Sequence, residues 1–444
     1  MALLLAWMTF PGGGVYTWVW APAACAVLAL ALFVQPRIAR GEDVRLVDIM
    51  LVISGLAMAT QLVPLPSSLL HAIDPHLRPL RAAVFLLSPA ERTEALLLPI
   101  SVVPGDTAAA LGVFATAALL YWICRTICEE GGAGRIVRAI ATIGLVASVA
   151  AIVQRVESEE LLYGVWRPQD AGAKPYGPFV NRNHFATWII MACPLVFGYL
   201  LARAPSKRPQ RFSQRVAAAL KQLGSMRIWL VAAVCVMTLA MLLSTSRSGL
   251  IGLIGALTVS TWLTSKRQES DVWRWSILQG ALLVLVAISF ANFDALVARV
   301  DETLLRSGPG RGRSAIWTDA KAVIDDFPIT GTGAGTFGTA IAIYQTAEPG
   351  YAIGQAHNHY LQLLAEGGAL VAVPAALAVG AFVLLFRSRL SQDRTPNYLM
   401  RAGAGAGLAG VFLQSFWETG LRMPANAMLC AVLAAIATHA PTKD

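Results

Sequence analysis

Long apolar runs separated by short polar loops dominate the chain from end to end. Most runs approach the roughly 20 residues that a helix needs to cross about 30 Å of hydrocarbon. The pattern predicts spanning segments at 15–34, 46–65, 105–124, 136–154, 184–202, 228–244, 249–264, 275–292, 360–386, 402–417 and 425–439. Residues 2–11 are apolar but short, and a glycine run begins at Gly12, so this piece is either a further helix or a re-entrant segment. We therefore expect an all-α polytopic bundle of about eleven or twelve transmembrane helices.

Composition supports this class of protein. Hydrophobic residues make up 56% of the chain and charged residues only 14%, whereas soluble domains contain about 25% charged residues. The net charge of +9 is carried by short loops between apolar runs, which fits membrane topology and lipid headgroups better than nucleic acid. The six cysteines lie in or beside apolar segments, so they predict neither a disulfide framework nor a metal site.

The charge of the loops predicts which side of the membrane each loop occupies. Loop 203–227 contains many arginines and lysines and no acidic residue, so the positive-inside rule places it in the cytoplasm. Stepping outward helix by helix puts further basic residues on the same side: Arg37, Arg40, Arg45, Arg125, Arg135, Arg138, Lys266, Arg267, Arg274, Arg387, Arg389, Arg394 and Arg401. The opposite side receives loops 66–104, 155–183, 245–248, 293–359 and 418–424. We expect a multi-pass protein of the bacterial inner membrane with its functional face toward the periplasm.

The long outer loop late in the chain defines the expected domain organisation. Long ordered loops are usually functional, and this one contains a helical stretch at 314–326 and glycine-rich turns at 331–338. We therefore divide the chain into three parts. These are the first part of the transmembrane bundle at 1–292, a periplasmic loop with short helices at 293–359, and C-terminal transmembrane helices at 360–444.

Arginines on the outer face run against the usual charge asymmetry. Arg247 lies in a turn between two apolar runs, Arg182 lies where a helix enters the membrane, and Arg311 and Arg313 lie in the long loop. A single interfacial arginine often only snorkels to lipid headgroups. Arginine also binds phosphate bidentately, and an outward-facing membrane enzyme meets phosphate mainly on lipids. Arg247, at a helix end, is therefore the first candidate to hold a lipid diphosphate.

Two histidines open the helix that follows the long loop. His357 and His359 flank Asn358, next to the arginine-bearing segment. Imidazole titrates near neutral pH and is the commonest general base, so we expect His357 to accept a proton from substrate. His359 is the competitor for this role, and spacing alone does not choose between them. No acidic triad suited to a metal stands out, so we expect no metal or other cofactor.

These residues together resemble the O-antigen ligase and polymerase superfamily. The motifs are Ser246-Arg247 at a turn between helices, Gly312-Arg313 followed by Trp317, the run Gly331-Thr332-Gly333-Ala334-Gly335-Thr336-Phe337, and His357-Asn358-His359-Tyr360-Leu361 with Glu366 and Gly368. Each motif alone is common, and the resemblance depends on their order, spacing and shared side of the membrane. Val371 departs from the pattern, because such proteins often carry a second glycine there.

The resemblance implies a GT-C-like membrane glycosyltransferase with an undecaprenyl-diphosphate-linked glycan as donor. A single long outer loop late in the chain favours a ligase that transfers O-antigen to lipid A–core. The resemblance implies a metal-independent inverting displacement in which Arg247 binds the diphosphate and His357 deprotonates the acceptor hydroxyl. Arg182 and Arg313 would assist at phosphate groups. The other candidate substrate-binding residues on these motifs are Arg311, Trp317, Asn358, His359 and Tyr360.

Other functions fit part of the pattern. An O-antigen polymerase would use the same chemistry with a lipid-linked glycan as acceptor, and a protein O-oligosaccharyltransferase would use a protein hydroxyl. A transporter of a lipid or phosphorylated substrate belongs to a different class. Transporters place ionisable groups near the membrane midplane and often contain internal repeats. The apolar runs here are nearly free of charge and show no repeat, which favours an enzyme.

Overall fold

The computed structural model describes residues 1–39, 41–86, 97–157, 160–169, 173–203, 225–265, 312–346 and 352–440. Within this part of the chain, seven helices are long and apolar enough to cross a membrane. They are α2 (Thr17–Val34), α7 (Pro104–Glu129), α8 (Ala133–Glu157), α9 (Arg182–Ala202), α11 (Ser225–Leu243), α12 (Arg247–Ser265) and α17 (His359–Gln392). The predicted span at 275–292 lies outside the described residues. The expected all-α, polytopic membrane fold is confirmed.

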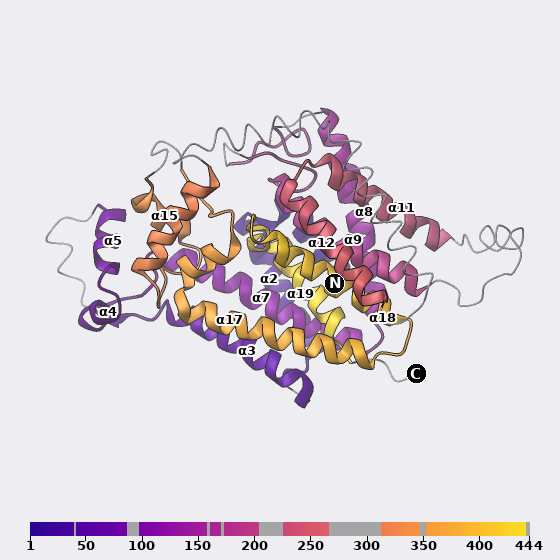
Figure 1. Ribbon diagram of the computed structural model, residues 1–444, viewed down its shortest axis with the longest axis horizontal. Helices are drawn as coiled ribbons and strands as arrows, with labels where there is room; N and C mark the ends of the chain where they lie inside the picture. The colour runs from indigo at the N-terminus through magenta and orange to yellow at the C-terminus, as the bar shows by residue number, and fades with distance from the viewer. Residues whose placement is uncertain are drawn as a thin grey trace, which may run out of the picture.

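Three further helices complete the described bundle: α3 (Glu42–Thr60), α18 (Asn397–Gln414) and α19 (Pro424–Thr438). Helix α18 packs against α9 and α12, α19 packs against α7, and α17 runs alongside α3 (Figure 1). Near the N-terminus, α1 (Ala2–Thr9) is followed by the 3₁₀ turn η1 (Gly12–Gly14). Because eight residues span only about 12 Å as a helix, α1 does not cross the membrane.

Small residues bring α9 and α18 into close contact. A Cβ atom on Gly403 would lie 2.3 Å from the carbonyl oxygen of Pro194, and one on Gly198 would lie 2.3 Å from the carbonyl oxygen of Leu399. Only glycine allows the two backbones to approach this closely. These two contacts join the C-terminal half of α9 to the N-terminal half of α18, and Gly407 continues the close approach, because its added Cβ atom would lie 2.7 Å from Met191 O.

Among the basic residues that the sequence assigned to cytoplasmic loops, Arg125 and Arg401 lie buried inside helices. Arg125 belongs to α7 and its Nη2 lies 2.7 Å from Oδ2 of Asp48 in α3. Arg401 belongs to α18 and its Nε lies 3.2 Å from Oδ2 of Asp393. All four side chains are buried. The helices extend further than their apolar runs, because a buried opposite charge can take the place of water for each guanidinium group.

Two loops between helices pack into one extramembrane unit. The first loop contains α4 (Ser67–Ile73), α5 (Leu77–Val84) and the antiparallel strands β1 (Leu65–Pro66) and β2 (Leu97–Leu98), in which Leu65 pairs with Leu98. The second contains α15 (Arg313–Asp326), which matches the helix expected at 314–326, and α16 (Phe337–Tyr344). A common apolar cluster joins the two loops, with Leu70, Leu77, Val323, Phe327 and Phe337 among its buried residues. The unit lies beside the helix bundle (Figure 1).

The backbone of α17 is interrupted at Gly368, where φ is 53° and ψ is −162°. The segment 328–333 of the second loop binds the backbone groups that the break releases. Its hydrogen bonds are Thr332 N to Ala365 O (3.0 Å), Gly333 N to Glu366 O (2.9 Å), Ala369 N to Pro328 O (2.8 Å) and Leu370 N to Ile329 O (2.9 Å). A helix break in a membrane-spanning segment requires such replacement partners. The break thus joins the extramembrane unit to the bundle.

Candidate active site

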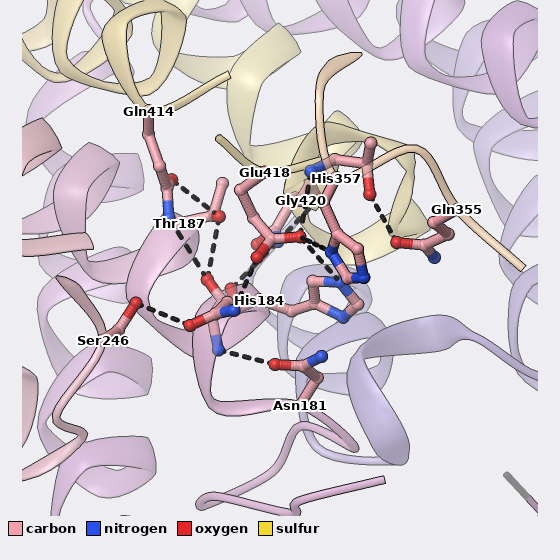
Figure 2. Close-up of polar contacts among 12 residues, drawn as sticks. Asn181, His184, Thr187, Ser246, Gln355, His357, Gln414, Glu418 and Gly420 are labelled. Carbon is pink, nitrogen blue, oxygen red and sulfur yellow. Dashed lines mark hydrogen bonds and ion pairs between the residues drawn. The ribbon is translucent and has the colours of Figure 1, made fainter. Parts of the chain in front are cut away.

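Six helices meet at one end of the bundle. Helices α9, α12, α17 and α19 begin there, and α11 and α18 end there. Hydrogen bonds between the ends establish the convergence. Arg182 Nη1 donates to Thr245 Oγ1 (2.8 Å), and His359 N donates to Ser415 O (2.9 Å). Segments far apart in the sequence therefore share one polar centre, shown in Figure 2.

Two asparagines begin the helices that carry this centre. Asn181 caps α9 by accepting a hydrogen bond from Asn183 N (2.8 Å), and Asn358 caps α17 by accepting from Tyr360 N (3.0 Å) and Leu361 N (3.1 Å). Asparagine is a preferred N-cap because its side chain satisfies amides that the first turn leaves free. Asn358, expected to bind substrate, thus uses its side-chain oxygen to start the helix.

Glu418, in the turn between α18 and the 3₁₀ helix η2 (Gly420–Arg422), is surrounded by basic side chains. Its Oε1 lies 3.6 Å from Nδ1 of His357 and 4.0 Å from Nε2 of His184, and its Oε2 lies 4.0 Å from Nη2 of Arg313. The Glu418 side chain is 1% exposed, that of His184 is 5% exposed, and that of His357 is 34% exposed. Figure 2 shows both imidazole rings directed at the same oxygen of this carboxylate. Of the two rings, His357 is the one open to solvent.

Two hydrogen bonds hold the Glu418 carboxylate in place. Asn183 Nδ2 donates to Oε2 at 2.6 Å, and the backbone N–H of Thr419 donates to Oε1 at 3.0 Å. Burial on its own raises the pKa of Glu418, but the contact with His357, the charges that His184 and His357 can carry and the Thr419 N–H together lower this pKa to about 2. Glu418 is therefore an anion at physiological pH.

The same network reaches the turn that carries Arg247. Ser246 Oγ donates to Oδ1 of Asn183 at 2.7 Å, which orients the Asn183 amide so that its nitrogen faces Glu418. Ser246 Oγ also accepts from Gly249 N at 3.2 Å in the first turn of α12. Arg247 is exposed and begins α12. A continuous chain of polar contacts therefore runs from the residue beside Arg247 through Asn183 and Glu418 to His357.

The structure brings together several of the residues expected from the sequence. His357 and Arg313 share Glu418, and Arg182 contacts the turn before Arg247. Trp317 Nε1 donates to Ala356 O at 3.0 Å, directly before His357. These contacts place the beginning of α15 against the segment that leads into α17. Arg311 lies outside the described residues.

The remaining two expected residues have other contacts. Tyr360 donates its hydroxyl to Phe412 O at 2.7 Å, and its ring lies 4.7 Å from the ring of Phe416. The ring of His359 interacts electrostatically with Arg422 and Glu366 rather than with Glu418. Of the two histidines that the sequence left as rivals, His357 is the one paired with Glu418.

The second carboxylate, Glu366, organises the glycine-rich loop. It accepts hydrogen bonds from Gly335 N (2.8 Å), Gln362 Nε2 (3.1 Å) and Phe337 N (3.3 Å), and it pairs with Arg422 Nη1 at 2.6 Å. The motif residues Gly335, Phe337 and Glu366 therefore bind one another. Their arrangement fixes the loop next to the first turns of α17.

Glu418 was not among the residues expected from the sequence. The only local feature that marks it is its position as the single acidic residue of the short turn 418–424, directly after an apolar run. Asn183 and His184 stand beside Arg182 in the sequence, but nothing there links them to a residue more than 200 positions away. Among the described residues, no group of three or more His, Cys, Asp or Glu side chains is arranged to hold a metal ion.

Part of the chain matches a known protein family. Residues 232–376, which include α12, α15, α16 and the first part of α17, match the family model described as O-antigen ligase. No curated protein matches the chain. The matched segment contains Arg247, Arg313 and His357, whereas Glu418 and Asn183 lie outside it. This match supports the assignment of the multi-pass helical chain to the O-antigen ligase family. In general terms, it supports a membrane glycosyltransferase of the O-antigen ligase and polymerase type.

Proposed function

We propose that the protein transfers O-antigen glycan from undecaprenyl diphosphate to a sugar hydroxyl of lipid A–core at the periplasmic face of the inner membrane. The observation that carries the proposal is the convergence of His357, Arg313 and a buried Glu418 at the end of the bundle where α12 and α17 begin. A partly exposed imidazole beside an anion and a guanidinium group supplies both a base and a cation to a substrate at this end.

His357 is the proposed general base. Its Nδ1 faces Glu418 at 3.6 Å, which leaves the other ring nitrogen for the acceptor hydroxyl. That nitrogen takes the hydroxyl proton while the acceptor oxygen forms a bond to the anomeric carbon of the donor sugar. The bond between the anomeric carbon and the diphosphate oxygen breaks, and undecaprenyl diphosphate leaves with the electron pair. Attack opposite the leaving group inverts the anomeric configuration.

Arginines are proposed to hold the diphosphate. Arg247 begins α12 beside the network, Arg182 contacts the same turn, and Arg313 is 41% exposed at the edge of Glu418. Guanidinium groups bind phosphate oxygens through paired N–H donors and stabilise the charge that develops on the leaving group. This chemistry needs no metal. Trp317 and Tyr360 bind backbone carbonyls through their polar atoms, so they would offer only ring faces to a substrate.

The test is transfer by the purified full-length protein in a mixture of undecaprenyl-diphosphate-linked O-antigen and lipid A–core, with a chelator present. We expect glycan on lipid A–core, and we expect His357→Ala to lower the rate by about 10²-fold or more because the base acts in the transition state. His71→Ala is the control, since His71 is exposed on α4 away from the network. Normal transfer by His357→Ala would refute the assignment of the base.

The acceptor is tested separately in a deletion strain. Loss of a ligase leaves bare lipid A–core and accumulates long lipid-linked polymer. Loss of a polymerase leaves lipid A–core carrying one repeat unit, and loss of a protein glycosyltransferase removes a glycoprotein instead. The surface polysaccharide ladder on a gel therefore distinguishes the proposed acceptor from a glycan or protein acceptor.

A further inference from the structure

We propose that Glu418 is the positioning residue of the active site: it holds the His357 ring with its Nδ1 proton toward the carboxylate and stabilises the ring once it has accepted a second proton. The proposal rests on the proposed function for its catalytic meaning, but the interaction itself can be measured without any substrate. It extends the site beyond the segment that matches the family model, because Glu418 follows that segment in the chain.

The geometry around Glu418 suits a positioning role. Asn183 Nδ2 donates to one carboxylate oxygen at 2.6 Å and Thr419 N donates to the other at 3.0 Å. The side chain is 1% exposed, so water neither competes for it nor screens its charge. A carboxylate fixed in this way presents Oε1 to His357 in one orientation only.

The contact with Glu418 determines which nitrogen of His357 meets the substrate. Nδ1 of His357 is buried, and it has no hydrogen-bond partner within the part of the chain that the structure describes. Its close polar neighbour is Oε1 of Glu418 at 3.6 Å. An acceptor-only group at Nδ1 favours the tautomer with the proton on that nitrogen. Nε2 is then left unprotonated as the acceptor for the substrate proton.

His184 lies near the same oxygen of Glu418 as His357. Its Nε2 lies 4.0 Å from Oε1 of Glu418, on the side of the carboxylate that belongs to α9 (Figure 2). The His184 side chain is 5% exposed, whereas that of His357 is 34% exposed. His184 therefore shares the charge of Glu418 without access to substrate. Arg313, at 4.0 Å from Oε2, is the third basic group facing this carboxylate.

The experiment measures how fast diethyl pyrocarbonate modifies His357 in the full-length protein, because this reagent attacks only the neutral ring. Peptide mass spectrometry separates His357 from His359 by fragment ions, and buried His184 serves as an internal comparator. At about pH 6, we expect His357 in Glu418→Gln to react about five- to tenfold faster than in the unchanged protein, because the anion that favours the protonated ring is gone. At about pH 8, where a free imidazole is neutral, the two rates should agree.

Two further variants make the result decisive. Glu160→Gln removes a charge from an exposed ion pair with Arg167 and should leave the His357 rate unchanged at both pH values. Glu418→Asp keeps the charge but withdraws it by one methylene, so its rate at low pH should lie between the other two. It also provides the comparison if Glu418→Gln does not fold. Equal acceleration at both pH values would show a mere change in exposure and would overturn the proposal, as would no acceleration at all.

The transfer assay separates this proposal from the proposed function. If both hold, Glu418→Gln lowers kcat by about 10²-fold while the KM for the lipid-linked donor changes much less, because the base loses orientation and charge stabilisation but the arginines remain. If the unchanged protein transfers no glycan yet the pH-dependent reactivity is found, the proposed function fails and the positioning role of Glu418 stands. If transfer occurs and the reactivity is unchanged, only the role of Glu418 fails.

Discussion

At the scale of single residues, backbone conformation separates His357 from the other histidines. Its φ of 49° lies in the left-handed region, which residues with a side chain rarely adopt. Such a conformation costs on the order of 1–3 kcal/mol and persists only where surrounding contacts hold it. Here Asn358 starts α17 directly afterwards and Trp317 binds Ala356 directly before. Both contacts favour a fixed turn that presents the His357 ring to Glu418.

The charge of Glu418 predicts how stability depends on pH. Its folded pKa of about 2 lies below the ordinary value of 4.5, so its contribution to stability is complete above about pH 4.5 and is lost as the pH falls toward 2. Glu418→Gln should therefore lower the Tm in detergent most near neutral pH, and the difference from the unchanged protein should shrink below about pH 4.5. Thermal unfolding across this range checks the sign. A difference that grows on acidification would contradict an ionised, stabilising carboxylate.

At the scale of secondary-structure elements, the break in α17 connects the loop motif to the site. The first turns of α17 carry His359, Tyr360 and Glu366, and the break at Gly368 lets segment 328–333 bind backbone groups of the same helix between Ala365 and Leu370. The loop that begins with Arg313 is therefore fixed relative to His357 through backbone hydrogen bonds. Backbone contacts of this kind hold position better than long side chains, because fewer rotatable bonds lie between the groups.

Gly368→Ala tests the break. A Cβ atom at Gly368 would lie 2.4 Å from Ile329 O, and φ and ψ there are accessible essentially to glycine alone. We expect a loss of stability of at least about 1–3 kcal/mol and a marked loss of monodisperse protein on size-exclusion chromatography. Gly380→Ala is the matched control in the same helix, because nothing lies within 4 Å of its added Cβ atom. It should fold as well as the unchanged protein. Equal behaviour of the two variants would show that the break is not required.

At the scale of the whole molecule, buried charge pairs stabilise the bundle at the end opposite the candidate site. Asp48 accepts two hydrogen bonds from Arg125, each at 2.7 Å, and further bonds from Trp122 Nε1 and Ala39 N. The pair joins α3 to α7. A buried ion pair contributes little relative to apolar residues, but removal of one partner leaves an uncompensated charge.

Asp48→Ala should therefore destabilise the protein by about 3–5 kcal/mol. Asp325→Ala removes a carboxylate from an exposed pair with Lys321 and should change stability by less than about 1 kcal/mol. The double variant Asp48→Leu with Arg125→Leu should recover much of the lost stability, since no unpaired charge is then left. Unfolding midpoints measured in one detergent compare all four proteins. A double variant no more stable than Asp48→Ala would argue against this account.

The amino-acid sequence by itself determined the membrane class, the position of most helices and the candidate chemistry on the matched segment. Spanning helices are predictable because about 20 consecutive apolar residues lower the free energy of insertion wherever they occur in a chain. Observed α9 at Arg182–Ala202 and α12 at Arg247–Ser265 differ from the expected 184–202 and 249–264 by polar residues in the first turn and, for α12, by Ser265 at the end. The motifs are likewise recognisable from the sequence, because each is a short run of neighbouring residues.

Tertiary structure alone decided which polar groups meet. Asn183 and Glu418 are separated by 235 positions, and nothing in the pattern of either segment indicates that they share a hydrogen bond. That contact depends on how closely α9 and α18 pack, which is set by glycine contacts along their shared face. The different surroundings of His357 and His359 have the same origin. Both side chains have identical chemistry, and only the fold places one beside Glu418 and the other beside Glu366 and Arg422.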